Sequence, residues 1–195
     1  MKKVVTLLLL WLSVYPVFAE EYTTVTCYEA GGLDKIISEE ELKTITHLKL
    51  VGNINDADLC YVEQANVVQY LDIEDAKVGI INGCFCKNSS LKEVRLPETC
   101  YSIVSSFKES TIQKINLDRV TAEIYSSFVS CPQLKSIGII SAKTTYDSFN
   151  NCAIDTLTIS DSVTEIGAVS FMNCPSLCYI QFPNRLTKIG EKSFS

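Results

Sequence analysis

The sequence predicts an α/β repeat fold: a leucine-rich-repeat solenoid with one parallel β-sheet face, short helical or extended backs and a small N-terminal cap. Two observations predict it. An apolar triplet recurs every 20 to 23 residues, and a column of phenylalanines recurs with nearly the same period. A single unit of this length cannot enclose its own apolar face, but stacked units can. The period therefore indicates a stack of coils.

The triplets follow the pattern Leu-x-x-Leu-x-Leu, which is the leucine-rich-repeat signature. Their central residues are Leu48, Leu71, Val94, Ile115, Ile137, Leu157 and Ile180. The third position is also apolar in every unit: Leu50, Ile73, Leu96, Leu117, Ile139, Ile159 and Phe182. Residues two apart in a strand face the same side, so we expect both columns to point inward. The phenylalanine column is expected to form a spine on the opposite wall: Phe85, Phe107, Phe128, Phe149, Phe171 and Phe194.

The N-terminus predicts export. Met1-Lys2-Lys3 precedes an almost unbroken apolar run to Val14, and small residues lead up to Glu20. This is the pattern of a secretory signal peptide, which we place at residues 1–19 with cleavage after Ala19. The apolar run is shorter than the roughly 20 residues that span a bilayer, so the mature chain is expected to be secreted or held at the cell surface without a transmembrane segment.

Residues 20–44 are predicted to form the N-terminal cap, and residues 45–195 the repeat domain of seven units, the last incomplete. Within 20–30 we expect a strand that pairs with the first unit. Ser38 and Glu41 have the capping-box spacing, which predicts a short helix over 39–44. Asn55 to Asp58 predict the start of a second helix of about three turns, with Leu59, Val62 and Val67 on its inner side.

Net charge and cysteine content limit the kinds of partner and site that the chain is expected to have. The chain carries a formal net charge of −6, which argues against nucleic acid or an anionic membrane surface as the partner. It has nine cysteines, an odd number. Cys131, Cys152 and Cys174 each follow a spine phenylalanine by three residues. These three cysteines have two possible interpretations. In the first they form a ladder of disulfides or serve as metal ligands; in the second they are small buried side chains that fill a bend, and we favour the second. A pair between Cys174 and Cys178 stays open.

Some of the later units carry a more specific pattern: Cys131-Pro132-Gln133-Leu134, Asp161 to Gly167, Ser170 to Leu177, and Leu186 to Gly190 with Ser193-Phe194. They resemble BspA-type leucine-rich repeats, found largely in bacterial and some protist surface or secreted proteins. The resemblance covers about Phe85 to Ser195, and Gly32 to Val78 resembles the N-terminal units of such proteins from Bacteroidetes-like bacteria. It implies a non-enzymatic adhesive or protein-binding module. The middle units depart from the pattern, with Tyr146 where isoleucine is usual and Ser110 where Asn-Cys is usual.

Catalysis has little support in the sequence. His47 is the only histidine, so a Ser-His-Asp or Cys-His device would have to use it, and no Gly-x-Ser-x-Gly segment accompanies it. Glu39-Glu40-Glu41 is interpreted as the acidic first turn of a helix. We predict no catalytic residue, no cofactor and no metal site; an exported hydrolase is the disfavoured third hypothesis.

The outward strand positions form the candidate binding face. The residues before and after each central apolar position run His47, Tyr70, Glu93, Lys114, Ser136, Thr156, Tyr179 and Lys49, Asp72, Arg95, Asn116, Gly138, Thr158, Gln181. The candidate binding residues among them are His47, Lys49, Tyr70, Asp72, Glu93, Arg95, Lys114, Asn116, Tyr179 and Gln181. Tyrosine and arginine are enriched at binding hot spots. Alternatively, the charged neighbours simply pair, which contributes only about 0–1 kcal/mol each.

The predicted function is an exported module that presents this face to a protein or glycan ligand. The alternative is a structural spacer or self-assembling segment without a ligand of its own. No capping segment follows the strand around Ile180, which leaves the strand edge and the last apolar layer open. We therefore expect either a truncated gene product or end-to-end self-association through the uncapped C-terminus.

Overall fold

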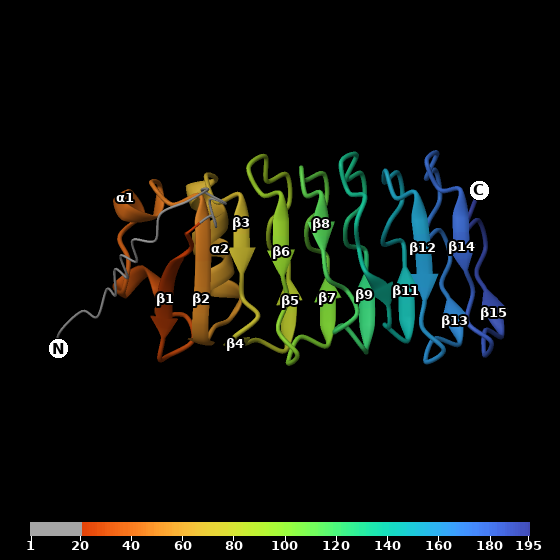
Figure 1. Cartoon of the computed structure of the whole chain (residues 1–195), viewed down its shortest axis with the longest axis horizontal. Coiled ribbons are helices and arrows are strands. Elements are labelled where there is room, and N and C mark those ends of the chain that lie inside the picture. Colours follow the sequence, from red (N-terminus) through yellow and green to blue (C-terminus); the bar gives the residue numbers. More distant parts are fainter. Residues whose placement is uncertain (1–20) are drawn as a thin grey trace, which may run out of the picture.

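The computed structural model describes residues 21–195 as a row of coils stacked along one axis. Residues 1–20, with the predicted signal peptide and its cleavage site, lie outside the described residues. Figure 1 shows the coils side by side, with β1 near one end of the row and β15 at the other. All strand pairs are parallel, as expected when each coil repeats the path of the one before it.

The elements follow one another as strands of two to seven residues, with the helices confined to the N-terminal part. They are β1 (Thr23–Cys27), the 3₁₀ helix η1 (Leu33–Lys35), α1 (Glu39–Leu42), β2 (His47–Asn53), α2 (Asp56–Ala65), β3 (Tyr70–Asp72), β4 (Ala76–Lys77), β5 (Ile80–Asn82), β6 (Glu93–Arg95), β7 (Ser102–Val104), β8 (Lys114–Ile115), β9 (Glu123–Tyr125), β10 (Ile139–Ile140), β11 (Thr144–Tyr146), β12 (Thr156–Ile159), β13 (Glu165–Ile166), β14 (Tyr179–Gln181) and β15 (Lys188–Ile189). From residue 21 onward, no helix is both long and apolar enough to cross a bilayer.

The front wall carries the strands that the apolar triplets predict. One sheet has the order β1-β2-β3-β6-β8, with β4 paired to β2, and a second has the order β10-β12-β14. Leu48 pairs with Leu71, Leu71 with Val94, and Val94 with Ile115. The central apolar residues of the first four units therefore stand on adjacent coils, as predicted. Parallel strands and few helices fit a solenoid-like repeat fold.

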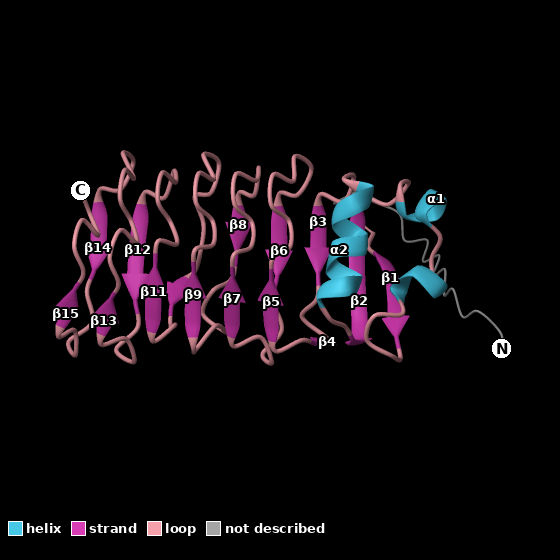
Figure 2. Cartoon of the chain, turned by 180° about the vertical axis from the view of Figure 1, so that it is seen from behind, coloured by secondary structure: helices cyan, strands magenta, loops and turns pink. Residues whose placement is uncertain are grey.

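The extended backs expected after the helix are present, but the expectation of a single sheet face is wrong, because these return runs pair with one another as strands. A back wall contains the sheet β11-β9-β7-β5 and the pair β13-β15. In Figure 2 these strands point opposite to those of the front wall. Ile81, Ile103 and Ile124 pair in register there and are buried. Their β-branched side chains favour extended backbone, and the stacking supplies the hydrogen-bond partners. Two walls, not one, enclose the core.

The N-terminal helices begin where the sequence predicts. Ser38 and Asn55 each form a capping box with the acidic residue three positions on, Glu41 and Asp58. β1 pairs with β2, which extends the front sheet into the cap. One detail was wrong: Asn66 adopts a left-handed conformation and ends α2, so Val67 lies outside the helix.

The phenylalanine spine forms as predicted. Successive rings from Phe85 to Phe194 stack with centroids 5.1 to 5.5 Å apart. The rings from Phe85 to Phe171 are almost fully buried. Offset stacks of this kind contribute about 0.5–1.5 kcal/mol per pair beyond the burial of apolar area.

A buried serine column directly before the spine was not predicted. It consists of Ser106, Ser127, Ser148, Ser170 and Ser193. Each of the five hydroxyls donates toward one carbonyl of the preceding coil and one of its own; Ser127, for example, lies 3.3 Å from Ile103 O and 2.9 Å from Tyr125 O. These bonds satisfy buried carbonyls and tie adjacent coils together. The second unit, that of Leu71, has Cys84 at this position, before Phe85.

The cysteine column fills the bend, as we favoured. The thiols of Cys131 and Cys152 donate to the carbonyls of Phe107 and Phe128 at 2.9 and 3.0 Å, and Cys174 donates in the same way to Phe149 at 3.0 Å. All nine cysteines are present as thiols. Ser110, the departure noted in the sequence, takes the same column position one coil earlier and contacts Cys131 Sγ at 3.5 Å.

The fifth unit contains a bulge that the alignment of the repeat units with one another missed. Ile139 was expected in the core, but it is 44% exposed and Ile140 is buried instead. Ile140 pairs with Ile159, so one extra residue separates it from Ile137. Gly138 provides the bulge with φ of +70°, a conformation that glycine adopts without steric cost.

At two further positions, the burial of the side chain differs from what the alignment of the repeat units predicted. Thr145 pairs with Ile124 and is buried, so threonine takes the usual isoleucine place and Tyr146 faces outward. Phe182 was assigned to the core, but it is 46% exposed. It belongs to the last coil, which packs against a neighbour on one side, and its ring meets Phe194 edge-on at 5.9 Å.

Two buried thiols make stability sensitive to alkaline pH. Burial raises the pKa of Cys27 from 9.0 to about 11, with the Asp58 carboxylate adding to the shift, and burial raises the pKa of Cys100 from 9.0 to about 12. Both thiols therefore stay neutral in the folded chain at a pH where the unfolded chain ionises them. Below pH 9, we expect these two thiols to leave the free energy of unfolding unchanged with pH. Above pH 9, the free energy of unfolding should fall by about 1.4 kcal/mol per pH unit for each thiol.

Urea unfolding of the chain and of a Cys27→Ala, Cys100→Ala variant between pH 8 and pH 11 tests this expectation. The variant should lose less stability over this interval than the parent chain. An identical alkaline loss in both proteins would contradict the role of these thiols.

Candidate binding face

The front face, defined as the outer face of the front wall, carries the predicted binding residues. His47, Tyr70, Glu93 and Lys114 pair in register across four coils, and Lys49, Asp72 and Arg95 form the parallel column. Thr156 pairs with Tyr179 and Thr158 with Gln181 at the other end. The first column continues from Lys114 to Ser136, and the bulge then places Ile139 instead of Gly138 beside Thr158.

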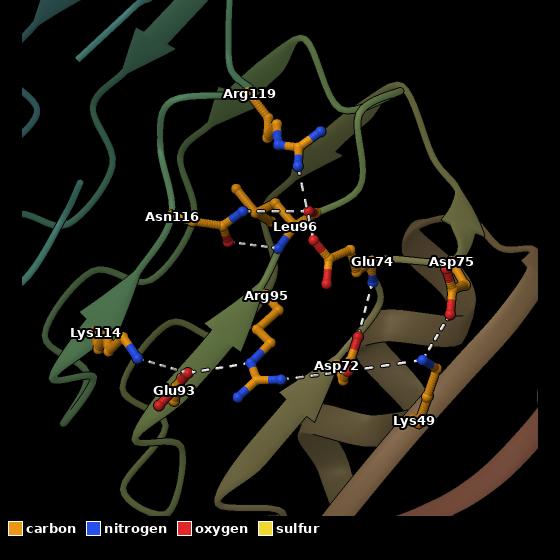
Figure 3. A network of polar contacts seen from close by, with 10 residues as sticks. All are labelled: Lys49, Asp72, Glu74, Asp75, Glu93, Arg95, Leu96, Lys114, Asn116 and Arg119. Atoms are coloured by element: carbon orange, nitrogen blue, oxygen red, sulfur yellow. Dashed lines mark hydrogen bonds and ion pairs between the residues drawn. The ribbon is translucent and has the colours of Figure 1, made fainter. Parts of the chain in front are cut away.

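A charged network occupies the middle of this face (Figure 3). Lys49 Nζ lies 2.6 Å from Asp75 and 3.9 Å from Asp72, whose carboxylate also lies 3.9 Å from Arg95. Arg95 and Lys114 both contact one oxygen of Glu93, at 3.3 and 3.0 Å. The charges of neighbouring coils therefore pair with one another.

Two members of the candidate set are engaged in holding the backbone. Asp72 was predicted to face solvent, but it is 5% exposed, because Lys49 and Arg95 converge on it and its other oxygen accepts the Glu74 N–H at 3.0 Å. The Asn116 amide bonds both backbone groups of Leu96, accepting at 2.7 Å and donating at 3.3 Å. Asn116 thereby completes the pairing beyond the short strand β8.

The ion pairs shift the pKa values of the cations Lys49 and Arg95 in the expected direction. The hydrogen bond with Asp75 raises the pKa of Lys49, and the hydrogen bond with Glu93 raises the pKa of Arg95. Both cations stay charged at neutral pH. For the centre of the face, the structure therefore fits the interpretation in which the alternating charges pair with their neighbours. Solvent screening keeps each exposed pair weak.

An aromatic cluster lies at the N-terminal end of the front face and consists of Tyr22, His47 and Tyr70. The rings of His47 and Tyr70 stack at 4.4 Å, and Tyr22 meets His47 edge-on at 5.5 Å. Two cations border the cluster: Lys92 lies 5.9 Å from the Tyr70 ring and Arg95 lies 6.0 Å from the Tyr22 ring. All three aromatic side chains are half-buried. The cluster combines rigid rings with positive charge.

The opposite end of the face is apolar and more open. Tyr179 is 56% exposed, and Ile139 stands nearby in the strand β10, two coils earlier. Gln181 continues the column beside Thr158. The front face thus has an aromatic end, a charged middle and a second tyrosine-bearing end.

Sequence reasoning missed exposed aromatic residues at two places. Tyr22 joins the cluster because the pairing of β1 with β2 places its ring beside His47. This contact was missed because the sequence assigned no strand register to the cap. On the back wall, Tyr125 and Tyr146 stack at 5.4 Å and are nearly half exposed. Each stands three residues before a spine phenylalanine, and this spacing was available in the sequence.

The end of the last coil contains a hollow of about 670 Å³. Its lining includes Phe171 and Phe194 from the spine, Cys174 from the cysteine column, and Leu177 and Ile180 from the last apolar triplet. The hollow is therefore the continuation of the core columns. Among the described residues, no group of three or more His, Cys, Asp or Glu side chains is placed to hold a metal ion.

Coils of this period, with parallel strands on the face and an apolar spine within, define a leucine-rich-repeat protein. The model of the BspA type leucine rich repeat region matches the chain in six copies, over residues 58–147 and 143–195. The chain belongs to this family. A comparison with curated proteins finds no match.

Proposed function

We propose that the chain is an exported, non-enzymatic binding module that contacts a protein ligand through its front face. Leucine-rich repeats serve as protein-binding modules, and the signal-peptide pattern of residues 1–19 supports export to the cell surface or the medium. Binding residues carried on paired strands are held more rigidly than residues on loops, which lowers the entropic cost of association.

The aromatic cluster is the observation that carries this proposal. Tyr22, His47 and Tyr70 present flat rings that are already ordered by stacking, and Arg95 and Lys92 add positive charge at their edge. Tyrosine and arginine dominate binding hot spots because they bury large areas at a low cost in side-chain entropy. The paired charges in the middle of the face would form the polar surround of such a hot spot.

The test is a binding screen followed by two matched variants. The purified chain is applied to immobilised extracellular-matrix proteins, to a glycan array and to immobilised copies of itself. For a protein that binds, Tyr70→Ala should weaken affinity at least about tenfold, since hot-spot truncations cost about 2 kcal/mol or more. Tyr146→Ala, an exposed tyrosine on the back wall, should leave affinity within about twofold.

The opposite result, with Tyr146→Ala weakening binding and Tyr70→Ala leaving it unchanged, would remove the front face from the proposal. Melting curves of both variants check that each remains folded. Selective binding to the glycan array would replace the protein ligand by a carbohydrate.

A structural spacer is the second candidate, favoured by the hollow at the last coil. Phe182 is 46% exposed and its ring meets Phe194, which lines the hollow, at 5.9 Å; Ile189 in β15, the last strand, is 50% exposed. Apolar side chains in such a place would be covered by further repeats or by another copy of the chain. In the same screen, a spacer would bind only the immobilised copies of itself.

A further inference from the structure

The junction between α2 and the back wall differs from the three junctions that follow it. Those three are joined on the back by parallel pairing, β5 with β7, β7 with β9 and β9 with β11. The α2 coil has a helix in this place, and the backbone groups of a helix interior are bonded within the helix. β5 is therefore the edge of its sheet, and its Asn82 N–H donates to the Asp56 side chain at 3.1 Å instead of to a strand.

The serine column also changes at this junction. In the following coils, Ser106, Ser127 and Ser148 donate to a carbonyl of the preceding coil. Cys84 occupies the same position next to the helix. Its thiol contacts the Asn82 carbonyl of its own coil at 3.4 Å, but toward the preceding coil it lies 3.7 and 3.9 Å from the Asp56 oxygens. At the junction between α2 and β5, the serine hydroxyl tie between coils is thus replaced by a longer thiol contact, and the strand ladder is absent as well.

A second cysteine lies within reach of Cys84. Cys60, on α2, places its Sγ 3.5 Å from the Sγ of Cys84. Cys60 is half-buried and Cys84 is fully buried. The column cysteines differ, because Cys131, Cys152 and Cys174 each donate to a phenylalanine carbonyl at 2.9 to 3.0 Å. The Cys60 thiol contacts Cys84 itself.

We propose that Cys60 and Cys84 are the site of a disulfide that fastens α2 to the back wall when the chain meets an oxidising environment. A disulfide bond has an S–S length of about 2.0 Å, so its formation must bring together two sulfur atoms that now lie 3.5 Å apart. The site is independent of the binding function proposed above.

The reaction is a thiol–disulfide exchange with a small-molecule disulfide as the oxidant. The thiolate of Cys60, the more accessible of the two, attacks one sulfur of the oxidant, forms a mixed disulfide and releases one thiol. The thiolate of Cys84 then attacks the sulfur of Cys60, forms the intramolecular bond and releases the second thiol. Two cysteine thiols are oxidised, one disulfide is reduced to two thiols, and both protons leave with the released thiols.

The surroundings make the second step pH-dependent. Burial, together with Cys60, Asp56 and Glu63, raises the pKa of Cys84 well above its ordinary value. Cys84 is therefore protonated at neutral pH, and its attack on the mixed disulfide should accelerate as the pH rises.

Peptide mapping with oxidised glutathione tests the proposal. A Cys178→Ser chain, which lacks the exposed cysteine, is incubated with oxidised glutathione, alkylated and digested without reduction. We expect a cross-linked peptide that contains Cys60 and Cys84, and two fewer alkylated cysteines than in the reduced sample. The oxidised chain should melt about 5–10 °C above the dithiothreitol-reduced chain, since the bond closes a loop of moderate length.

Two serine variants are matched controls. Cys84→Ser is expected to fold, because serine occupies this position in later coils, and it should lose both the cross-link and the redox-dependent shift in melting temperature. Cys131→Ser should keep both, since Ser110 fills the same column one coil earlier. The proposal is overturned by cross-links that join other cysteines, by glutathione adducts on Cys60 alone, by a chain that stays fully reduced, or by a melting shift that persists in Cys84→Ser.

Discussion

Replacing Leu157 with aspartate is expected to unfold the coils around it. Leu157 is fully buried in the middle of β12 and pairs with Ile180 on the next coil. The substitution removes a large apolar side chain and places a carboxylate in the core without a partner. We expect the free energy of unfolding to fall by more than about 4 kcal/mol, a large part of the 5–15 kcal/mol typical of a domain. Circular dichroism and thermal melting measure the loss.

The matched control is Thr158→Asp, the neighbouring residue whose side chain lies on the front face. The same charge there remains in contact with water, and its cost should stay within about 1 kcal/mol. Near-normal melting of Leu157→Asp, or equal losses in the two variants, would mean that β12 does not present Leu157 to the core.

The second large effect is expected from truncating the spine. Phe128 is fully buried and stacks on Phe107 at 5.1 Å and on Phe149 at 5.4 Å. Phe128→Ala removes both stacking contacts and leaves a cavity between coils, which typically costs about 3–5 kcal/mol. For a chain of this length the melting temperature should fall by about 10 °C.

Tyr125→Ala removes an aromatic ring from the same coil but from the solvent side of the back wall. Tyr125 is 45% exposed and stacks only on Tyr146 in the described contacts, so its loss should cost about 1 kcal/mol or less. Phe128→Leu, which retains most of the buried volume, should fall between the two. Equal melting temperatures for Phe128→Ala and Tyr125→Ala would contradict an internal spine.

The front wall could be predicted because its residues repeat with one period. Leu48, Leu71 and Val94 share a column whose apolar character is needed in every coil. The back wall was harder to predict, because its strands are two or three residues long and show no extended alternation. Such short segments become strands only when neighbouring coils supply the other half of each hydrogen bond.

The candidate site was predicted in outline but not in its distribution of charge and aromatic character. Alternating signs at Lys49, Asp72 and Arg95 predicted pairing, and the structure adds that Asp72 is buried by the two cations. The aromatic cluster depended on Tyr22, which lies in the cap. Tyr22 lies beside His47 because β1 pairs with β2. The repeat pattern does not extend into the cap, so it did not predict this pairing.

The sequence by itself determined the period of the coils, the apolar columns, the phenylalanine spine, the capping box at Ser38 and the start of the second helix at Asn55, because each follows from local spacing or from a pattern repeated many times. Only the tertiary structure decided which of two adjacent isoleucines, Ile139 or Ile140, enters the core, and which cysteine faces Cys60. Both choices depend on how one coil is set against another more than 20 residues away. That register is determined by backbone pairing between coils, which a single coil's residues do not specify.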